Sequence, residues 1–432
     1  MNLLDTMSSS TKTKIDDLVT SIPSNIDMTG TTNLNVKSYA GYANSSIHGK
    51  KAGIFYWFFE SQSKKTKDTP IIMWFNGGPG ASSTLGLFLE NGPYTMKDDG
   101  NIIENPYSWN KNAHIIYWDQ PIGTGYSMVY DESPQTTFVE NEDELSQMLY
   151  EAFNSFLETH DEYSDCPIYI MGESYGGKYV PNIALKFDEH GNKNLKGIAV
   201  GDGWINSRLQ MKNYIDYVYT LGYMDSKQYE IMNSEYKQFA KYLDLKIYDK
   251  AYTLSNDMVD EASSYGGNFD VYDIRSFKSI SMDNVKTYMS NKKVKEILNV
   301  PTDKTWECAD NTGPVASNLI EDNMIDSSNL YSELIKQTDK YKVLMYAATF
   351  DTACGALSTE MILNDISKWG NEEDNEMWFN ASRNIWKDDG DIPRGFIKSY
   401  KNLTQIIIPN SGHQVPYFQP KASLDMINRF IK

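Results

Sequence analysis

The sequence predicts an α/β protein with a mostly parallel central sheet and helices on both of its faces. Short apolar runs separated by Gly, Pro and Asn alternate along the chain with segments whose apolar residues recur at helical spacing. This alternation is typical of parallel sheets, because a helix usually joins each strand to the next. The chain has 432 residues, of which 40% are hydrophobic and 23% charged, so it can bury a large core.

The first part of the chain contains most of the expected strands. They are residues 53–60, 71–75, 114–118, 167–171 and 196–200. Helices are expected over residues 137–160 and 179–187, because apolar side chains recur there every three or four residues. The polar residues 1–30 are expected to be a loose or helical lead-in.

The middle of the chain, residues 207–300, has a different composition from the segments on either side. It is charged and rich in Tyr, and its spacing predicts helices over residues 226–243 and 283–299. The α/β pattern then resumes with two helices and two strands, at residues 328–337, 341–348, 403–409 and 420–431. We therefore expect one α/β core made of residues 1–206 and 301–432, with residues 207–300 inserted as a helical cap over the edge of the sheet that carries the site.

The charge of the chain argues against two classes of partner. Forty Lys and Arg residues against 58 Asp and Glu residues give a net charge of -18, which repels the phosphates of nucleic acids. No run approaches the roughly 18 apolar residues of a membrane span.

The first residues, MNLLDTMSSSTKTKIDD, lack the apolar segment of a secretory signal, and three cysteines form no disulfide framework. The compartment stays open.

The stretch Gly172-Glu173-Ser174-Tyr175-Gly176 fits the G-x-S-x-G pattern of a nucleophile elbow. It follows an apolar strand and precedes a helix, as an elbow requires. Small residues two before and two after the serine are expected to let strand and helix approach closely. Ser174 is therefore the candidate nucleophile, and the alternative is that it merely fills a tight turn.

Chain order selects the partners of Ser174. In elbow-type hydrolases the acid and then the histidine follow the serine, which leaves only His190 and His413 of the five histidines. His190 lies in a polar loop sixteen residues after the serine, whereas His413 follows an expected strand. Asp351, after the strand 341–348, is the candidate acid, and Asp202 is its rival.

A glycine-rich loop, Asn76-Gly77-Gly78-Pro79-Gly80, follows the strand 71–75. Backbone N–H groups in such a loop can stabilise an oxyanion, and we expect the N–H groups of Gly78 and Tyr175 to do so. A phosphate-binding loop is the alternative, but no Lys-Ser or Lys-Thr follows the glycines.

Several longer motifs together resemble those of the serine carboxypeptidases. They are SYAGY (38–42), FYWFFES (55–61), WFNGGPGASS (74–83), FLENGP (88–93), YWDQPIGTGYS (117–127), GESYGGKYVP (172–181), LKGIAVGDGWI (195–205) and GHQVPYFQPKASLDMI (412–427). The resemblance runs from about residue 36 to 430 and is weakest over roughly 210–290. It implies an α/β-hydrolase fold with a helical insertion and the release of C-terminal amino acids from peptides. It assigns the same catalytic triad, Ser174, Asp351 and His413.

The resemblance also implies a binding site for the free carboxylate of the substrate. That site would consist of Asn76, the N–H of Gly77, Glu90 and Glu173, all of which are present. Two carboxyl groups that face a third repel it unless they carry protons, which predicts activity at acid pH. Cys354 matches a position near the substrate cleft in some members, although a buried structural thiol is an equal alternative.

The chain departs from the family pattern at several positions without losing a catalytic group. Ala81 replaces the usual Cys of GPGCSS, so the disulfide anchored there is missing. Gly177 replaces the usual Ala, and Phe418 replaces an Asp. The segment before Asp351 lacks the Gly and Asp that are usual there.

We therefore predict a serine carboxypeptidase that forms an acyl-enzyme, needs no cofactor or metal, and acts on the C-termini of peptides or proteins as a monomer or homodimer. One alternative is an acyltransferase or esterase with the same fold. The other is an inactive member that serves as a binding or protective partner. The family suggests a vacuolar, lysosomal or secreted protein, although the sequence shows no signal peptide.

Overall fold

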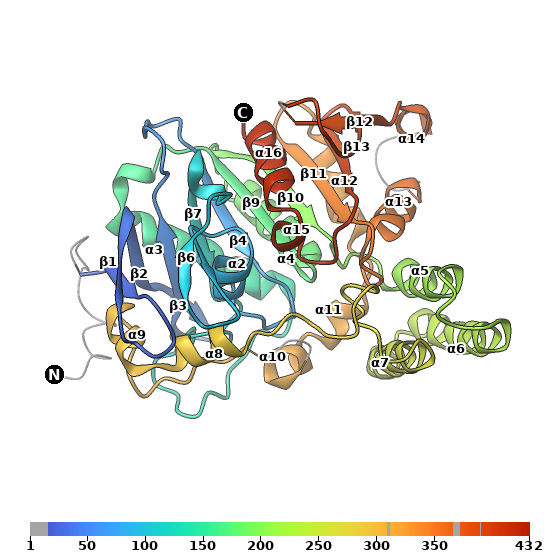
Figure 1. The fold of residues 1–432 in the computed structure, drawn as a ribbon, viewed down its shortest axis with the longest axis horizontal. Helices are drawn as coiled ribbons and strands as arrows, with labels where there is room; N and C mark the ends of the chain where they lie inside the picture. The colour runs from blue at the N-terminus through green and yellow to red at the C-terminus, as the bar shows by residue number, and fades with distance from the viewer. Residues whose placement is uncertain (1–15, 309–311, 366–371, 389) are drawn as a thin grey trace.

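The computed structural model describes residues 16–308, 312–365, 372–388 and 390–432. Over these residues, a 12-stranded sheet forms the centre of the molecule, with helices on both faces (Figure 1). Its strands, in spatial order, are β1 (Leu18–Pro23), β2 (Thr31–Ile47), β3 (Lys50–Phe59), β7 (His114–Trp118), β4 (Ile71–Phe75), β9 (Ile168–Glu173), β10 (Leu195–Gly201), β11 (Lys342–Ala348), β14 (Leu403–Ile408), β13 (Pro393–Tyr400) and β12 (Asn384–Lys387), with β8 (Met128–Val129) paired to β3.

The strands from β7 to β14 are parallel, and the strands on either side of them are antiparallel. All five predicted strands of the first part coincide with strands of the structure, as do the strands expected over 341–348 and 403–409. The parallel strands are covered on both faces, so they are almost continuously apolar. β4, for example, has the sequence IIMWF, and every one of its residues is buried.

The edges of the sheet were the least predictable part. Residues 1–15 lie outside the described residues, but residues 18–23 of the expected lead-in form strand β1 rather than a loop or helix. The first half of β2 alternates between exposed and half-buried residues, and in the edge strand β12 three of the four residues are exposed. Edge strands face water on one side, so they lack the apolar runs that mark the central strands.

Two hydrophobic clusters lie on opposite faces of the sheet, and β4 contributes alternate side chains to each. One face is covered by helices α3 (Glu142–Thr159), α4 (Gly176–Glu189), α12 (Ser328–Lys336), α13 (Ala356–Asn364) and α14 (Glu372–Asn380). The other is covered by α2 (Thr84–Leu89), α15 (Val415–Phe418) and α16 (Pro420–Phe430), beside the hairpin of β5 (Tyr94–Met96) and β6 (Ile102–Glu104).

The segment 207–300 divides into two groups of helices. Helices α5 (Ser207–Thr220), α6 (Ser226–Asp244) and α7 (Tyr248–Tyr265) share a hydrophobic cluster of their own and stand at one end of the molecule (Figure 1). Helices α8 (Asp283–Ser290) and α9 (Lys292–Ile297) instead contribute to the cluster that includes β1 and β3. The expected helix over 283–299 is broken at Asn291, whose side chain caps α9. The division of the chain into a core and an inserted cap stays a prediction.

Two short helices, α10 (Gly313–Asn318) and α11 (Ile320–Met324), connect this region back to the sheet. Among the described helices, none is long and apolar enough to cross a lipid bilayer.

Candidate active site

Ser174 lies between the end of β9 and the start of α4, in a backbone conformation that is rare for serine. Its φ is +59°, in the left-handed region. The backbone is held there by three hydrogen bonds: Ser174 N–H donates to Gly201 O at 3.1 Å, and Ser174 O accepts from Gly177 N–H at 2.8 Å and Trp204 N–H at 2.7 Å. Such over-determined strain is typical of a functional turn.

The glycines around Ser174 allow the close approach of neighbouring backbone, but the structure corrects which of them do so. A Cβ at Gly172 would lie 2.7 Å from Phe75 O. A Cβ at Gly176 would meet only Phe75 O, at an ordinary 3.5 Å, whereas one at Gly177 would lie 2.6 Å from Trp204 O. The tight position after the serine is therefore Gly177, where alanine is the usual family residue.

The side chains of His413 and Asp351 form a hydrogen bond in the interior of the protein. His413 follows β14, Asp351 follows β11, and His413 Nδ1 lies 2.7 Å from Asp351 Oδ2. Both residues are buried. With a carboxylate accepting at Nδ1, the neutral ring carries its proton on that nitrogen, so Nε2 is the basic atom. The backbone N–H of His413 donates to Tyr272 O at 2.8 Å, and the two rings are 4.8 Å apart.

Ser174 and His413 line one cavity of about 190 Å³, which Asn76, Glu90 and Glu173 also line. Asn76 Nδ2 donates to Glu90 Oε1 at 3.1 Å and to Glu173 Oε1 at 2.9 Å. Asn76 Oδ1 accepts from Trp74 Nε1 at 2.9 Å and from Gly86 N–H at 3.0 Å, which fixes the orientation of the amide. The structure thus brings together the residues that the family resemblance implies for carboxylate binding.

The two glutamates have perturbed pKa values for one physical reason. Both are buried, and burial raises the pKa of Glu90 and holds the pKa of Glu173 well above its usual range. The negative charge of Glu90 raises the pKa of Glu173 further. Two such neighbours hold at least one proton between them at acid pH, and that proton can be donated to a third carboxylate.

The loop 76–80 lies against the elbow. A Cβ at Gly77 would lie 2.4 Å from Tyr175 N and 2.7 Å from Ser174 Cβ, so only glycine allows this approach. Gly78 has a φ of +112°, a conformation that favours glycine. Gly78, Ser174 and Tyr175 line a second cavity together.

A family model described as serine carboxypeptidase matches residues 28–432. The chain belongs to the serine carboxypeptidase family. A Dictyostelium discoideum protein named serine carboxypeptidase S10 family member 1 is 31% identical over 403 residues, which cover 91% of this chain and 94% of that protein. A human protein named probable serine carboxypeptidase CPVL is 29% identical, covering 92% of this chain and 84% of that protein.

A solved structure agrees with this membership at the level of the fold. It is the crystal structure of Kex1(delta)p, a prohormone-processing carboxypeptidase from Saccharomyces cerevisiae, with a TM-score of 0.80 at 20% identity. The similarity covers 97% of this chain and 96% of that chain. The predicted α/β-hydrolase fold is therefore confirmed.

The second cavity beside Ser174 gives this serine carboxypeptidase family member a feature that its motifs did not predict. The cavity measures about 150 Å³ and is lined by residues of α5, α7 and α11, of the loop after α7, and of the loops that follow β4, β9, β10 and β11. Its described lining consists of uncharged side chains, Gly78, Ser174, Tyr175, Trp204, Met211, Tyr214, Tyr252, Ser255, Asn256, Val259, Val271, Tyr272, Asn323, Ala353 and Cys354. Cys354, the expected cleft residue, is among them, and burial holds the pKa of its thiol well above the usual range.

The structure also shows where the alternative candidates His190 and Asp202 lie, and it adds Tyr272, which no motif marked. His190 is exposed and far along α4 from the elbow, next to Gln147. Asp202 lies beside Asp351 and His413: one ligand atom of each lies within 4.8 Å of the other two. Tyr272 lines both cavities next to His413, but it lies in the segment 207–300, where no motif marked it.

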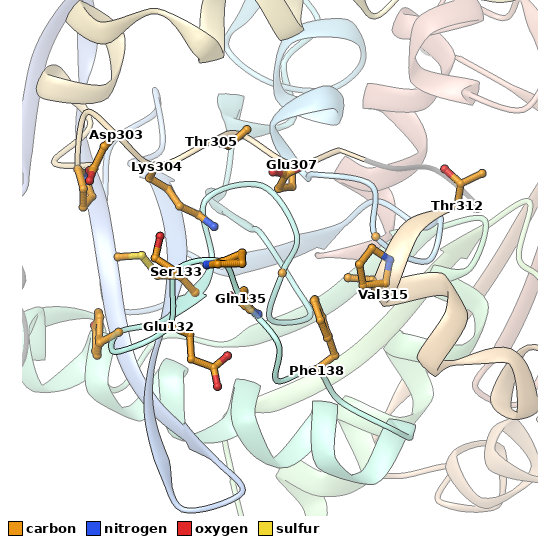
Figure 2. A pocket seen from close by; sticks show the side chains of 17 residues that line it. Glu132, Ser133, Gln135, Phe138, Asp303, Lys304, Thr305, Glu307, Thr312 and Val315 are labelled. Atoms are coloured by element: carbon orange, nitrogen blue, oxygen red, sulfur yellow. The ribbon is translucent and has the colours of Figure 1, made fainter.

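A larger cavity, of about 550 Å³, is lined mainly by residues of the segments 132–138, 303–307 and 312–315 (Figure 2). It reaches the loop 76–80 at Gly80, and its walls include Lys304, Glu307 and Phe138. The catalytic and carboxylate-binding candidates of this serine carboxypeptidase family member lie outside its lining, so size alone is a poor guide to the reaction site here.

Proposed function

We propose that this chain releases single amino acids from the C-termini of peptides through an acyl-enzyme on Ser174. One observation carries the proposal. Ser174 and His413 share a cavity with the Asn76, Glu90 and Glu173 cluster, which suits a free carboxylate. Membership of the serine carboxypeptidase family supports the same reaction.

In the first half of the reaction, Ser174 Oγ attacks the carbonyl carbon of the last peptide bond while His413 Nε2 takes its proton. Asp351 accepts the hydrogen bond of His413 Nδ1 and stabilises the imidazolium. The N–H groups of Gly78 and Tyr175 stabilise the oxyanion. His413 then protonates the leaving amino group, the C–N bond breaks, and the acyl group stays on Ser174.

In the second half, water replaces the amino acid. His413 takes a proton from the water as its oxygen attacks the ester, and the proton returns to Ser174 Oγ when the ester bond breaks. The products are a shortened peptide and one free amino acid.

The arrangement of the two cavities accounts for where each part of the substrate would lie. The C-terminal residue would occupy the cavity lined by Asn76, Glu90 and Glu173, with its carboxylate accepting hydrogen bonds from protonated glutamic acid. The residue on the acyl side would place its side chain in the second cavity. Because that lining is uncharged and largely aromatic or aliphatic, we expect Phe, Leu and Met there to be favoured over Asp and Lys.

The proposal is tested with an N-blocked dipeptide and its C-terminal amide from about pH 4 to 8, each incubated with the wild type and Ser174→Ala. We expect release of the free amino acid from the acid substrate below neutral pH, little from the amide, and none with Ser174→Ala. Equal cleavage of the amide would indicate a general amidase or esterase. No release at any pH, or release that survives in Ser174→Ala, would show that the proposal is wrong.

A further inference from the structure

A second buried aspartate, Asp202, stands next to the Asp351 and His413 pair and has no part in the mechanism above. It directly follows β10, and the pairing of Gly201 with Tyr346 on β11 brings it to the strand that leads to Asp351. One of its carboxyl oxygens lies within 4.8 Å of a carboxyl oxygen of Asp351 and of a ring nitrogen of His413. Any role of Asp202 in the reaction rests on the proposed roles of Ser174, His413 and Asp351.

Hydrogen bonds of its backbone N–H and of its side-chain Oδ1 hold Asp202 in place. Its φ is +42°, which is uncommon for a residue other than glycine. Its N–H donates to Tyr346 O at 2.9 Å, and its Oδ1 accepts from Ala348 N–H at 2.9 Å. The side chain is inaccessible to solvent, and Oδ2 accepts no N–H from the described residues.

Two carboxyl groups can form a hydrogen bond with each other only if one of them carries a proton. Asp351 is the better place for the negative charge, since it accepts from His413 Nδ1, from Ala353 N–H at 2.8 Å and from Cys354 N–H at 3.2 Å. Among the described residues, Ala348 N–H is the one N–H group that donates to the carboxyl group of Asp202. The proton therefore belongs on Asp202.

A metal ion would be the alternative way to join the three side chains. Nitrogen and oxygen ligands about 2.0–2.1 Å from a tetrahedral ion lie about 3.3 Å apart. His413 Nδ1 and Asp351 Oδ2 are only 2.7 Å apart, which is the separation of a direct charge-assisted hydrogen bond. A proton fits the spacing and an ion between these two atoms does not.

We propose that Asp202 is a positioning residue: in its protonated form it donates a hydrogen bond to Asp351 and so holds that carboxylate against His413 Nδ1. When Asp202 loses its proton, two negative carboxylates stand side by side and repel, and Asp351 is displaced from His413. The alkaline fall of kcat would then report the ionisation of Asp202, whereas the Glu90 and Glu173 pair would affect substrate binding and hence KM.

The surroundings of Asp202 keep the proton in place. Burial raises the pKa of Asp202 well above its usual range, and the negative charge of Asp351 raises it further. The other ionisable groups that face it are Glu173 from β9, Tyr346 from β11, Cys354 after Asp351, and His413. Only His413 among these can become positively charged, and its contact is with Asp351.

The test compares Asp202→Asn, which keeps an N–H donor but cannot ionise, with Asp202→Leu, which has no donor. Asp322→Asn is the control, because it removes another aspartate whose pKa is raised, to about 6, away from the triad. We measure kcat and KM separately from pH 4 to 9, confirm folding by circular dichroism, and follow the low-field proton resonance of His413 Nδ1–H by NMR.

We expect Asp202→Asn to retain kcat at acid pH and to lose its alkaline fall. Asp202→Leu should lower kcat by about ten- to a hundredfold at every pH, the effect of losing one hydrogen bond to a charged group, with little change in KM. A wild-type kcat profile in both Asp202 variants would overturn the proposal. If Asp202→Leu does not fold, the proposal is still overturned when the kcat of Asp202→Asn falls at alkaline pH as the wild-type kcat does.

The NMR signal separates this inference from the proposed function, because it needs no substrate. On the alkaline side, where Asp202 would lose its proton, we expect the resonance to shift with pH in the wild type and in Asp322→Asn, and to lose that shift in Asp202→Asn. A wild type that releases no amino acid but shows this shift would overturn the function and leave the role of Asp202 standing. A resonance that behaves alike in wild type and Asp202→Asn would overturn the role of Asp202.

Discussion

A glutamic acid can bind a carboxylate only while it carries a proton. Asn76 holds Glu90 and Glu173 together through both of its N–H bonds, and the two glutamates share a buried site with raised pKa values. The protonated glutamic acids, which are the hydrogen-bond donors, are present at a pH below their raised pKa and are lost at a pH above it. Selection of a chain end and activity at acid pH would therefore have one cause.

Replacing either glutamate by glutamine should change the pH dependence of KM. Glutamine keeps a donor and cannot ionise, so we expect KM to rise with pH more weakly in Glu90→Gln and Glu173→Gln than in the wild type. Steady-state kinetics on the dipeptide from about pH 4 to 8 measures this. The exposed Glu158→Gln is the control. Variants whose KM follows the wild-type curve would contradict this account of the glutamate pair.

At the scale of elements, the turn from β9 to α4 depends on how closely the segment 203–204 approaches it. Trp204 N–H donates a hydrogen bond to Ser174 O, and Trp204 O lies 2.6 Å from the place that a Cβ of residue 177 would occupy. A side chain at position 177 would therefore displace the segment that supports Ser174, the candidate nucleophile. The same addition at position 176 meets no such contact.

Gly177→Ala and Gly176→Ala are thus a matched pair. We expect Gly177→Ala to lower the free energy of unfolding by about 1–3 kcal/mol, as overpacking does, and to lower kcat as well. Gly176→Ala should change the free energy of unfolding by less than about 0.5 kcal/mol. Urea unfolding and dipeptide kinetics give both quantities. Equal effects of the two substitutions would show that the close approach to Trp204 is not limiting.

Helix α7 forms one wall of the uncharged cavity beside Ser174, and Ser255 is a buried, small residue of that wall. We expect Ser255→Leu to fill the cavity and to lower kcat/KM at least about tenfold for substrates with Phe on the acyl side, but less than about twofold for Ala. Ser264→Leu is the control, because Ser264 lies exposed on the same helix and its hydroxyl likewise donates to the carbonyl of residue i−3. A uniform loss for all substrates would contradict the assignment of this cavity.

At the scale of the whole molecule, the structure buries several acids outside the site. Burial raises the pKa of Asp119 to about 7 and of Asp322 to about 6, and holds the pKa of Glu142 well above its usual range. A folded state that holds protons which the unfolded chain releases becomes less stable as the pH rises. His114 acts in the opposite direction, since burial lowers its pKa to about 4, but only up to about pH 6.5.

We therefore expect the free energy of unfolding to fall between about pH 6.5 and 8, by about 1.4 kcal/mol per pH unit for each acid still protonated in the folded state. Glu142→Gln should reduce this slope and be more stable than the wild type at pH 8. Urea unfolding at several pH values measures the effect, with the exposed Glu140→Gln as control. A free energy of unfolding that stays constant or rises between about pH 6.5 and 8 would contradict the account that buried acids stay protonated in the folded state.

Much of the fold could be predicted because its signals are local. Buried parallel strands such as β4 are apolar runs, and the elbow and the loop 76–80 are short motifs beside them. The edge strands β1 and β12 lack such runs, because one of their sides faces water. Much of the lining of the second cavity was equally hidden, since α5, α7 and the loop that carries Tyr272 contain no motif.

By itself, the sequence determined the order of the central strands and of the helices between them, the family, and the candidates Ser174, Asp351 and His413, because each of these is written in a short segment. Only the tertiary structure decided which groups meet. Asn76 and Glu173 are 97 residues apart, and Asp202 and Ala348 are 146 apart, yet each pair is hydrogen-bonded. The register of parallel strands sets these contacts, since it brings the carboxyl ends of distant segments to one edge of the sheet.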